Sequence, residues 1–206
     1  MGRLVEGFAI LILMLPAEAA PVSKDIPKLS LTLRMYDYAA IPQDALAQAE
    51  RAITRLLDEA GIQVRILWCS SGAEQRTPAE CRELLGATDL VVRIMPGAGP
   101  GGKGQLGVSV GTVMATVYYQ KAVEFSAEQP VSERVATGEI LGCGTAHEIG
   151  HLLLQTVGHS LTGTMRAGWS AEELKLIWGG KLHFTARQGE TMREGVMRRI
   201  QDSHRR

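Results

Sequence analysis

The sequence predicts an α/β domain in which a mixed, twisted sheet lies over one long helix, followed by a small helical C-terminal part. Three observations carry this prediction: strand-like segments surround a helical segment in the first half of the chain, a long apolar helix follows them, and a further helical segment comes last. The 22 basic and 22 acidic side chains balance, so the net charge favours neither nucleic acid nor an anionic membrane as partner.

Five segments have the residue pattern of strands, and the segment after the first has that of a helix. This helix has apolar residues at positions 46, 49, 53, 56 and 57 and a terminating glycine at 61. The fourth strand is short, and we expect it at a sheet edge. The expected strands are Leu29–Tyr38, Gln63–Cys69, Asp89–Met95, Leu106–Val110 and Ala115–Phe125, and the helix is Gln43–Ala60.

Two helical segments follow the strands. The first is expected from about Ser132 to Gln155, although it contains four glycines that each cost a helix about 0.5–1 kcal/mol relative to alanine. Packing must compensate, so we expect this helix to approach the sheet closely. The second is expected to run from Ser170 into the C-terminal tail, with Ser170 as cap and Glu173 as its capping-box partner. The four glycines are Gly138, Gly142, Gly144 and Gly150.

The first 19 residues have the pattern of a signal peptide. Arg3 precedes an uninterrupted apolar run, Phe8–Leu15, and Ala17 and Ala19 supply the small residues that a signal peptidase recognises. The run is far shorter than the roughly 20 residues that a transmembrane helix needs. We therefore expect cleavage after Ala19 and a single mature domain, residues 20–206, that is secreted or periplasmic and does not stay inserted in a membrane.

An oxidising compartment favours a disulfide between Cys69 and Cys81, which bracket a short polar loop. The third cysteine, Cys143, lies one helical turn before His147 in an apolar helix. We expect it to be a small buried side chain without a chemical role.

The chemistry of the chain is indicated by residues 146–151, which read AHEIGH and match the H-E-x-x-H motif. On a helix, His147 and His151 lie on one face, about 6 Å apart, so both imidazoles can reach one metal ion. Glu148 points slightly away from the pair, where it can take a proton from a water molecule held by zinc as this water attacks a carbonyl group.

A catalytic zinc takes three protein ligands and keeps one position open. His159 is the best candidate for the third ligand in the run HEIGHLLLQTVGHSLTGTM. This run resembles the metzincin clan of zinc metallopeptidases, and within it the matrixin-like arrangement of a third histidine, a serine and a methionine turn. The resemblance implies that His147, His151 and His159 bind one Zn²⁺ ion, that Glu148 is the general base, and that Met165 forms the apolar floor below the metal.

The run departs from the clan's usual HExxHxxGxxH pattern. His159 lies eight residues beyond His151 instead of six, and Leu154 stands where the clan has the glycine that ends the helix. We therefore expect the helix to end near Gln155 and the chain to turn at Gly158.

Two other interpretations stay open. Glu172 or Glu173 would complete the zinc site as in thermolysin-like peptidases, although Glu173 already has a local explanation in the capping box. The domain would alternatively be a secreted zinc-binding module without turnover, although retention of Glu148 favours an enzyme.

The resemblance also implies where a substrate lies. An extended peptide would add to the edge strand as a further strand, the glycine-rich segment 96–104 would form a mobile rim, and Trp169 would line the selecting pocket. We therefore expect a monomeric zinc endopeptidase that acts on peptides or proteins. The edge-strand residues are Leu106, Gly107, Val108, Ser109 and Val110.

Overall fold

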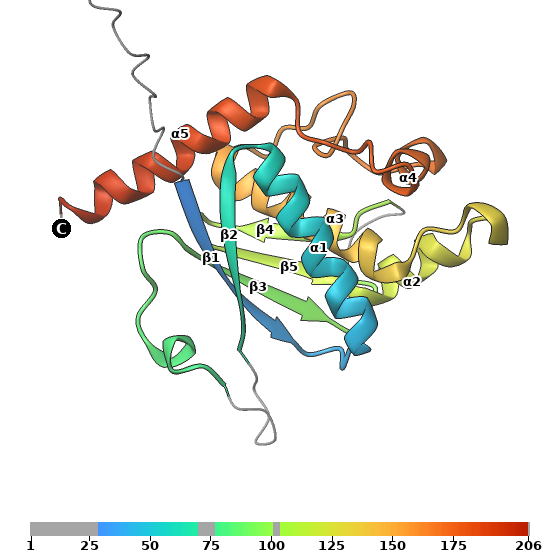
Figure 1. Ribbon diagram of the computed structural model, residues 1–206, viewed down its shortest axis with the longest axis horizontal. Coiled ribbons are helices and arrows are strands. Elements are labelled where there is room, and N and C mark those ends of the chain that lie inside the picture. The colour runs from blue at the N-terminus through green and yellow to red at the C-terminus, as the bar shows by residue number, and fades with distance from the viewer. Residues whose placement is uncertain (1–28, 70–76, 101–103, 206) are drawn as a thin grey trace, which may run out of the picture.

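The computed structural model describes residues 29–69, 77–100 and 104–205, and the expected signal peptide lies outside them. Within these residues five strands form one mixed sheet with the order β2-β1-β3-β5-β4 (Figure 1). The α/β class predicted from the sequence is therefore confirmed. The strands are β1 (Leu29–Asp37), β2 (Ile62–Trp68), β3 (Asp89–Met95), β4 (Gly107–Val110) and β5 (Met114–Tyr118).

Strand β4 differs from the other four strands in direction. Strands β2, β1, β3 and β5 pair in parallel, whereas β4 pairs antiparallel with β5, with Val108 opposite Thr116. Because β4 is last in the order, one side of it has no partner strand within the described residues. The short strand expected around Leu106–Val110 is thus an edge strand.

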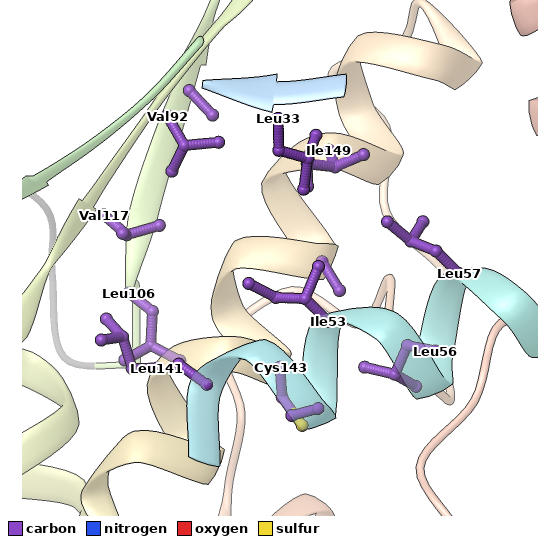
Figure 2. Close-up of a cluster of buried hydrophobic side chains, with 14 of the residues drawn as sticks. Leu33, Ile53, Leu56, Leu57, Val92, Leu106, Val117, Leu141, Cys143 and Ile149 are labelled. Carbon is purple, nitrogen blue, oxygen red and sulfur yellow. The ribbon is translucent and has the colours of Figure 1, made fainter. Parts of the chain in front are cut away.

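Two helices, α1 (Gln43–Glu59) and α3 (Thr137–Leu154), cover the same face of the sheet (Figure 1). Alternate residues of each strand point to this face, and the core fills the layer between sheet and helices (Figure 2). Cys143 lies in this core with no exposed surface, and burial raises the pKa of its thiol to about 12. It is a buried apolar side chain, as expected. The central strands contribute Leu31, Leu33, Met35, Leu90, Val92, Ile94, Ala115 and Val117.

The glycines of α3 permit close approaches, but mainly to helix α1 rather than to the sheet as expected. A Cβ atom on Gly138 would lie less than 3.0 Å from the carbonyl oxygen of Ala45, and one on Gly142 would lie as close to that of Ala49. Real Cβ atoms essentially never come this close to other atoms. Glycines one turn apart therefore let the two helix backbones touch.

Three segments differ from their predicted form. Helix α3 begins at Thr137 rather than near Ser132. Only the start of the expected strand Ala115–Phe125 is a strand, and α2 (Tyr119–Ala127) follows directly, with its buried residues on one side. Its aromatic and β-branched residues suggested a strand, but local propensity yields to packing.

The C-terminal segment, expected to be one helix, forms two helices. These are α4 (Ala171–Trp178) and α5 (Ala186–Ser203), and the chain turns between them at Gly180, where φ is +65°.

The connection between β2 and β3 is fastened at two points. The predicted disulfide between Cys69 and Cys81 is present, with Cα atoms 5.6 Å apart. Arg34 of β1 is 4% exposed, pairs with Asp89, and donates hydrogen bonds to the carbonyl oxygens of Glu83 and Leu84. No helix in the described part of the chain is both long and apolar enough to cross a membrane.

The contact between α3 and α1 makes a testable prediction for Gly142→Ala. Helix propensity alone would make this change stabilising by up to about 1 kcal/mol. The new Cβ would instead clash with Ala49 and with the Cβ of Ala52, so we expect a net destabilisation of about 1–3 kcal/mol in urea unfolding. Gly179→Ala is the control, because its nearest neighbour would be 3.4 Å away. Equal stabilities for the two variants would contradict the close contact.

Candidate metal centre and cleft

Helix α3 and the loop after it bring the three predicted histidines together. His147 and His151 lie one turn apart on α3, which ends at Leu154, and Gln155 then adopts a left-handed conformation with φ +52°. The prediction that the chain turns at Gly158 is wrong. The chain reverses direction at Gln155, and Gly158 has no positive φ. A left-handed residue commonly ends a helix, and here it sends the chain back so that His159 faces the helical pair.

The ring nitrogens of the three histidines converge on one point. The Nε2 atom of His151 lies 3.1 Å from Nε2 of His147 and 3.2 Å from Nε2 of His159. One ligand atom from each of the three residues lies within 4.8 Å of the others. Two nitrogens bound tetrahedrally to one zinc at 2.0–2.1 Å would be about 3.3 Å apart, so the spacing suits a single ion of this kind.

Hydrogen bonds to backbone carbonyls determine which nitrogens carry protons. Nδ1 of His147 lies 2.6 Å from the carbonyl oxygen of Thr164, and Nδ1 of His151 lies 2.8 Å from that of Thr156. A carbonyl oxygen only accepts, so both Nδ1 atoms are the donors. In the neutral rings the Nε2 atoms that face each other then both carry lone pairs. Without a cation between them, these nitrogens have no attractive interaction, so the donor set fits a metal ion.

Burial favours the neutral form of His147 and His151. The pKa of His147 is lowered to about 4, chiefly by burial and to a smaller extent by the neighbouring rings of His151 and His159, although the hydrogen bond to Thr164 opposes the fall. Burial also lowers the pKa of His151. A neutral imidazole is the form that binds a metal, and burial therefore prepares the pair for an ion at neutral pH.

Glu148 lies beside the histidines and is 5% exposed. Its Oε2 atom accepts a hydrogen bond of 2.6 Å from the hydroxyl of Ser109 on β4. Burial raises the pKa of this carboxyl group to about 7, although the bond from Ser109 opposes the rise. A general base is most effective with a pKa near the working pH, so in the metal-free protein this carboxyl group could exchange a proton near neutral pH.

A cleft of about 720 Å³ contains these groups and runs along the edge of the sheet. Strand β4 and the residue before it form one wall, and the loop after α3 forms another, where Val157 is 93% exposed. Of the five residues expected to bind substrate, Val110 alone does not line the cleft, and it is 51% exposed. The four that line it are Leu106, Gly107, Val108 and Ser109.

The glycine-rich segment expected to form a rim reaches this cleft at its last residue. Gly104 is among the lining residues, and its φ of +96° is a conformation that glycine adopts without strain. Residues 101–103 of the same segment lie outside the described part of the chain. The expectation of a rim is therefore supported at Gly104, and its mobility stays a prediction.

Met165 and Trp169 lie close to the histidines. Met165 is 1% exposed, and its Sδ atom occupies the space next to Gly150 that a side chain there would need. Its carbonyl oxygen accepts a hydrogen bond from the backbone N–H of Ser160, next to His159. Trp169 lines the cleft, and its ring packs edge-on against that of His147, with centroids 6.2 Å apart.

The two glutamates considered as alternative ligands have other surroundings. Glu173 forms the predicted capping box with Ser170 and pairs with Arg166. The side chain of Glu172 is exposed and lies 3.6 Å from Arg166. Among the described residues, the group that could hold a metal contains His147, His151 and His159 and neither glutamate.

Sequence reasoning missed several groups that shape the site. The carbonyl oxygens of Thr156 and Thr164 orient the rings, but backbone carbonyls leave no signal in residue type. Gln155 ends the helix in a conformation that glycine or asparagine usually adopts. Ser109 was expected only in the substrate strand, and the packing of β4 on α3 places its hydroxyl on Glu148.

Comparison with known proteins adds no assignment. No protein-family model matches the chain, and no curated protein matches its sequence significantly. The function of the site is therefore inferred from its geometry.

The opposite pKa shifts of His147 and Glu148 predict opposite effects on stability in the metal-free protein. His147 gives up a proton on folding, so its contribution to the free energy of unfolding falls as pH drops from about 6.5 to 4. Glu148 takes up a proton on folding, so its contribution to the free energy of unfolding falls as pH rises from about 4.5 to 7. We expect the free energy of unfolding to rise more steeply with pH in Glu148→Gln than in the wild type, and less steeply in His147→Gln. Urea unfolding in a chelator between about pH 4.5 and 6.5 measures both slopes. Equal slopes in all three proteins would contradict the assignment.

Proposed function

We propose that the protein is a zinc-dependent endopeptidase. The observation that carries this proposal is the convergence of three histidine nitrogens on one point, with the buried carboxyl group of Glu148 next to them. Zinc is favoured because three imidazoles and an open fourth position are typical of its catalytic sites. The metzincin resemblance of the run from His147 to Met165 supports the same conclusion.

When bound, zinc would polarise the carbonyl group of the substrate and make a water molecule more acidic. The three imidazoles would hold the ion, and the carbonyl oxygens of Thr156 and Thr164 would keep two of them oriented. Glu148 would accept a proton from the attacking water and pass it to the leaving amine. The burial of Glu148, which raises the pKa of its carboxyl group in the metal-free protein, favours proton uptake by this group.

The substrate is proposed to be an extended peptide. Residues of β4 line the cleft, and the side of this strand that has no partner strand among the described residues presents backbone N–H and C=O groups to which such a chain could hydrogen-bond. A peptide that pairs with β4 would be recognised along its backbone rather than at a terminus, which favours an endopeptidase. In this proposal Met165 packs below the histidines as the apolar floor, and Trp169 lines the adjoining wall.

Zinc binding tests the ligand set. We expect zinc to stabilise the wild type, by about 2.7 kcal/mol when its free concentration is 100 times its Kd, and we expect His159→Ala to lose most of this gain. His183→Ala is the control, because His183 is exposed and outside the cluster. Thermal unfolding with zinc and with a chelator measures the effect. If Glu172→Gln lost the stabilisation by zinc and His159→Ala kept it, the result would favour the thermolysin-like alternative.

Cleavage tests the activity itself. The zinc-loaded protein should cleave members of a diverse peptide mixture, as detected by mass spectrometry, and the cuts should vanish in Glu148→Gln while zinc stabilisation remains. The amide retains the size of Glu148 but cannot act as a base. Zinc binding by both proteins without any cleavage would favour the non-catalytic zinc-binding module.

A further inference from the structure

We propose that Ser109 is a positioning residue that holds the carboxylate of Glu148 in its working orientation. This inference rests on the proposed function of Glu148 as general base. The Oγ atom of Ser109 lies 2.6 Å from Oε2 of Glu148 and 3.0 Å from its backbone carbonyl oxygen. A bond of 2.6 Å is in the range of charge-assisted hydrogen bonds between a hydroxyl and a carboxylate.

The bond engages only one of the two carboxylate oxygens. Oε1 of Glu148 has no hydrogen-bond partner among the residues that the structure describes. Ser109 donates to Oε2, so Oε1 keeps both of its lone pairs available to accept the proton. Because the accepted proton and the Ser109 bond are on different oxygens, the bond can persist through proton uptake and release. The hydroxyl of Ser109 therefore restrains rotation of the Glu148 carboxylate and leaves Oε1 available for proton transfer.

The backbone of β4 reinforces this arrangement. Gly107 and Ser109 alternate with Val108, so both face α3. A Cβ on Gly107 would lie 2.8 Å from Cγ of Glu148 and 2.6 Å from the carbonyl oxygen of Thr116. The strand can therefore lie against the glutamate only because residue 107 has no side chain, and Ser109 then reaches its carboxylate.

This placement ties the base to the strand proposed to bind the substrate. A peptide paired with β4 would be held by the same backbone that carries Ser109. The bond from Ser109 then couples the carboxylate of Glu148 on α3 directly to β4, the strand that would hold the scissile bond. Loss of the hydroxyl should impair the chemical step while leaving zinc and peptide binding largely intact.

The test compares Ser109→Ala, Ser109→Thr and the control Ser30→Ala, an exposed serine on β1. We expect kcat of Ser109→Ala to fall about 10- to 100-fold, with KM and zinc stabilisation unchanged. Ser109→Thr keeps the hydroxyl and should restore most of the loss, and Ser30→Ala should match the wild type. An unchanged kcat in Ser109→Ala, or equal losses in the Ala and Thr variants, would overturn the proposal.

Crystal structures of the metal-free wild type and Ser109→Ala give a readout that needs no activity. We expect one Glu148 conformer, bonded to Ser109, in the wild type, and a rotated or multiple carboxylate in the variant. An identical carboxylate position in both would overturn the positioning role. If the wild type cleaves no peptide, the proposed function fails, whereas these structures still decide whether Ser109 orients Glu148.

Discussion

The contact between helices α3 and α1 is the constraint on which the site depends. Gly138 and Gly142 let the backbone of α3 touch that of α1 at Ala45 and Ala49. This contact sets the position of α3 relative to α1 and thereby contributes to the positions of the histidines and the glutamate that α3 carries. The apolar side chains between the two helices and the strands then hold the arrangement in place (Figure 2). A helix with so many glycines is weak by itself, and its tertiary contacts stabilise it.

The candidate metal centre is built from helix α3 and the loop that follows it. The helix presents two imidazoles, and the loop supplies His159 together with the carbonyl oxygen of Thr156 that orients His151. The same fold brings the carbonyl oxygen of Thr164 to His147. The contacts with Thr156 and Thr164 are single hydrogen bonds, but together they turn the Nε2 lone pairs of His147 and His151 toward one point. The proposed cation would therefore also stabilise the path of the loop.

Strand β4 links the proposed chemistry to the proposed substrate site. The strand pairs with β5, its residues Gly107, Val108 and Ser109 line the cleft, and Ser109 reaches the carboxylate of Glu148. The burial that raises the pKa of Glu148 and lowers that of His147 arises where α3 packs against neighbouring segments. The position and the protonation of the two groups thus have one structural origin.

Residue types and their spacing were enough to predict the α/β class, most strands, the disulfide between Cys69 and Cys81, the capping box at Ser170, and the histidines that converge. These features depend on local periodicity, short separations and side-chain chemistry. The helix at residues 119–127, the turn at Gln155 and the approach of α3 to α1 emerged only from the folded chain. So did the bond from Ser109 to Glu148, which joins residues 39 positions apart. Such contacts form between segments distant in the chain, so neither residue type nor periodicity encodes them locally.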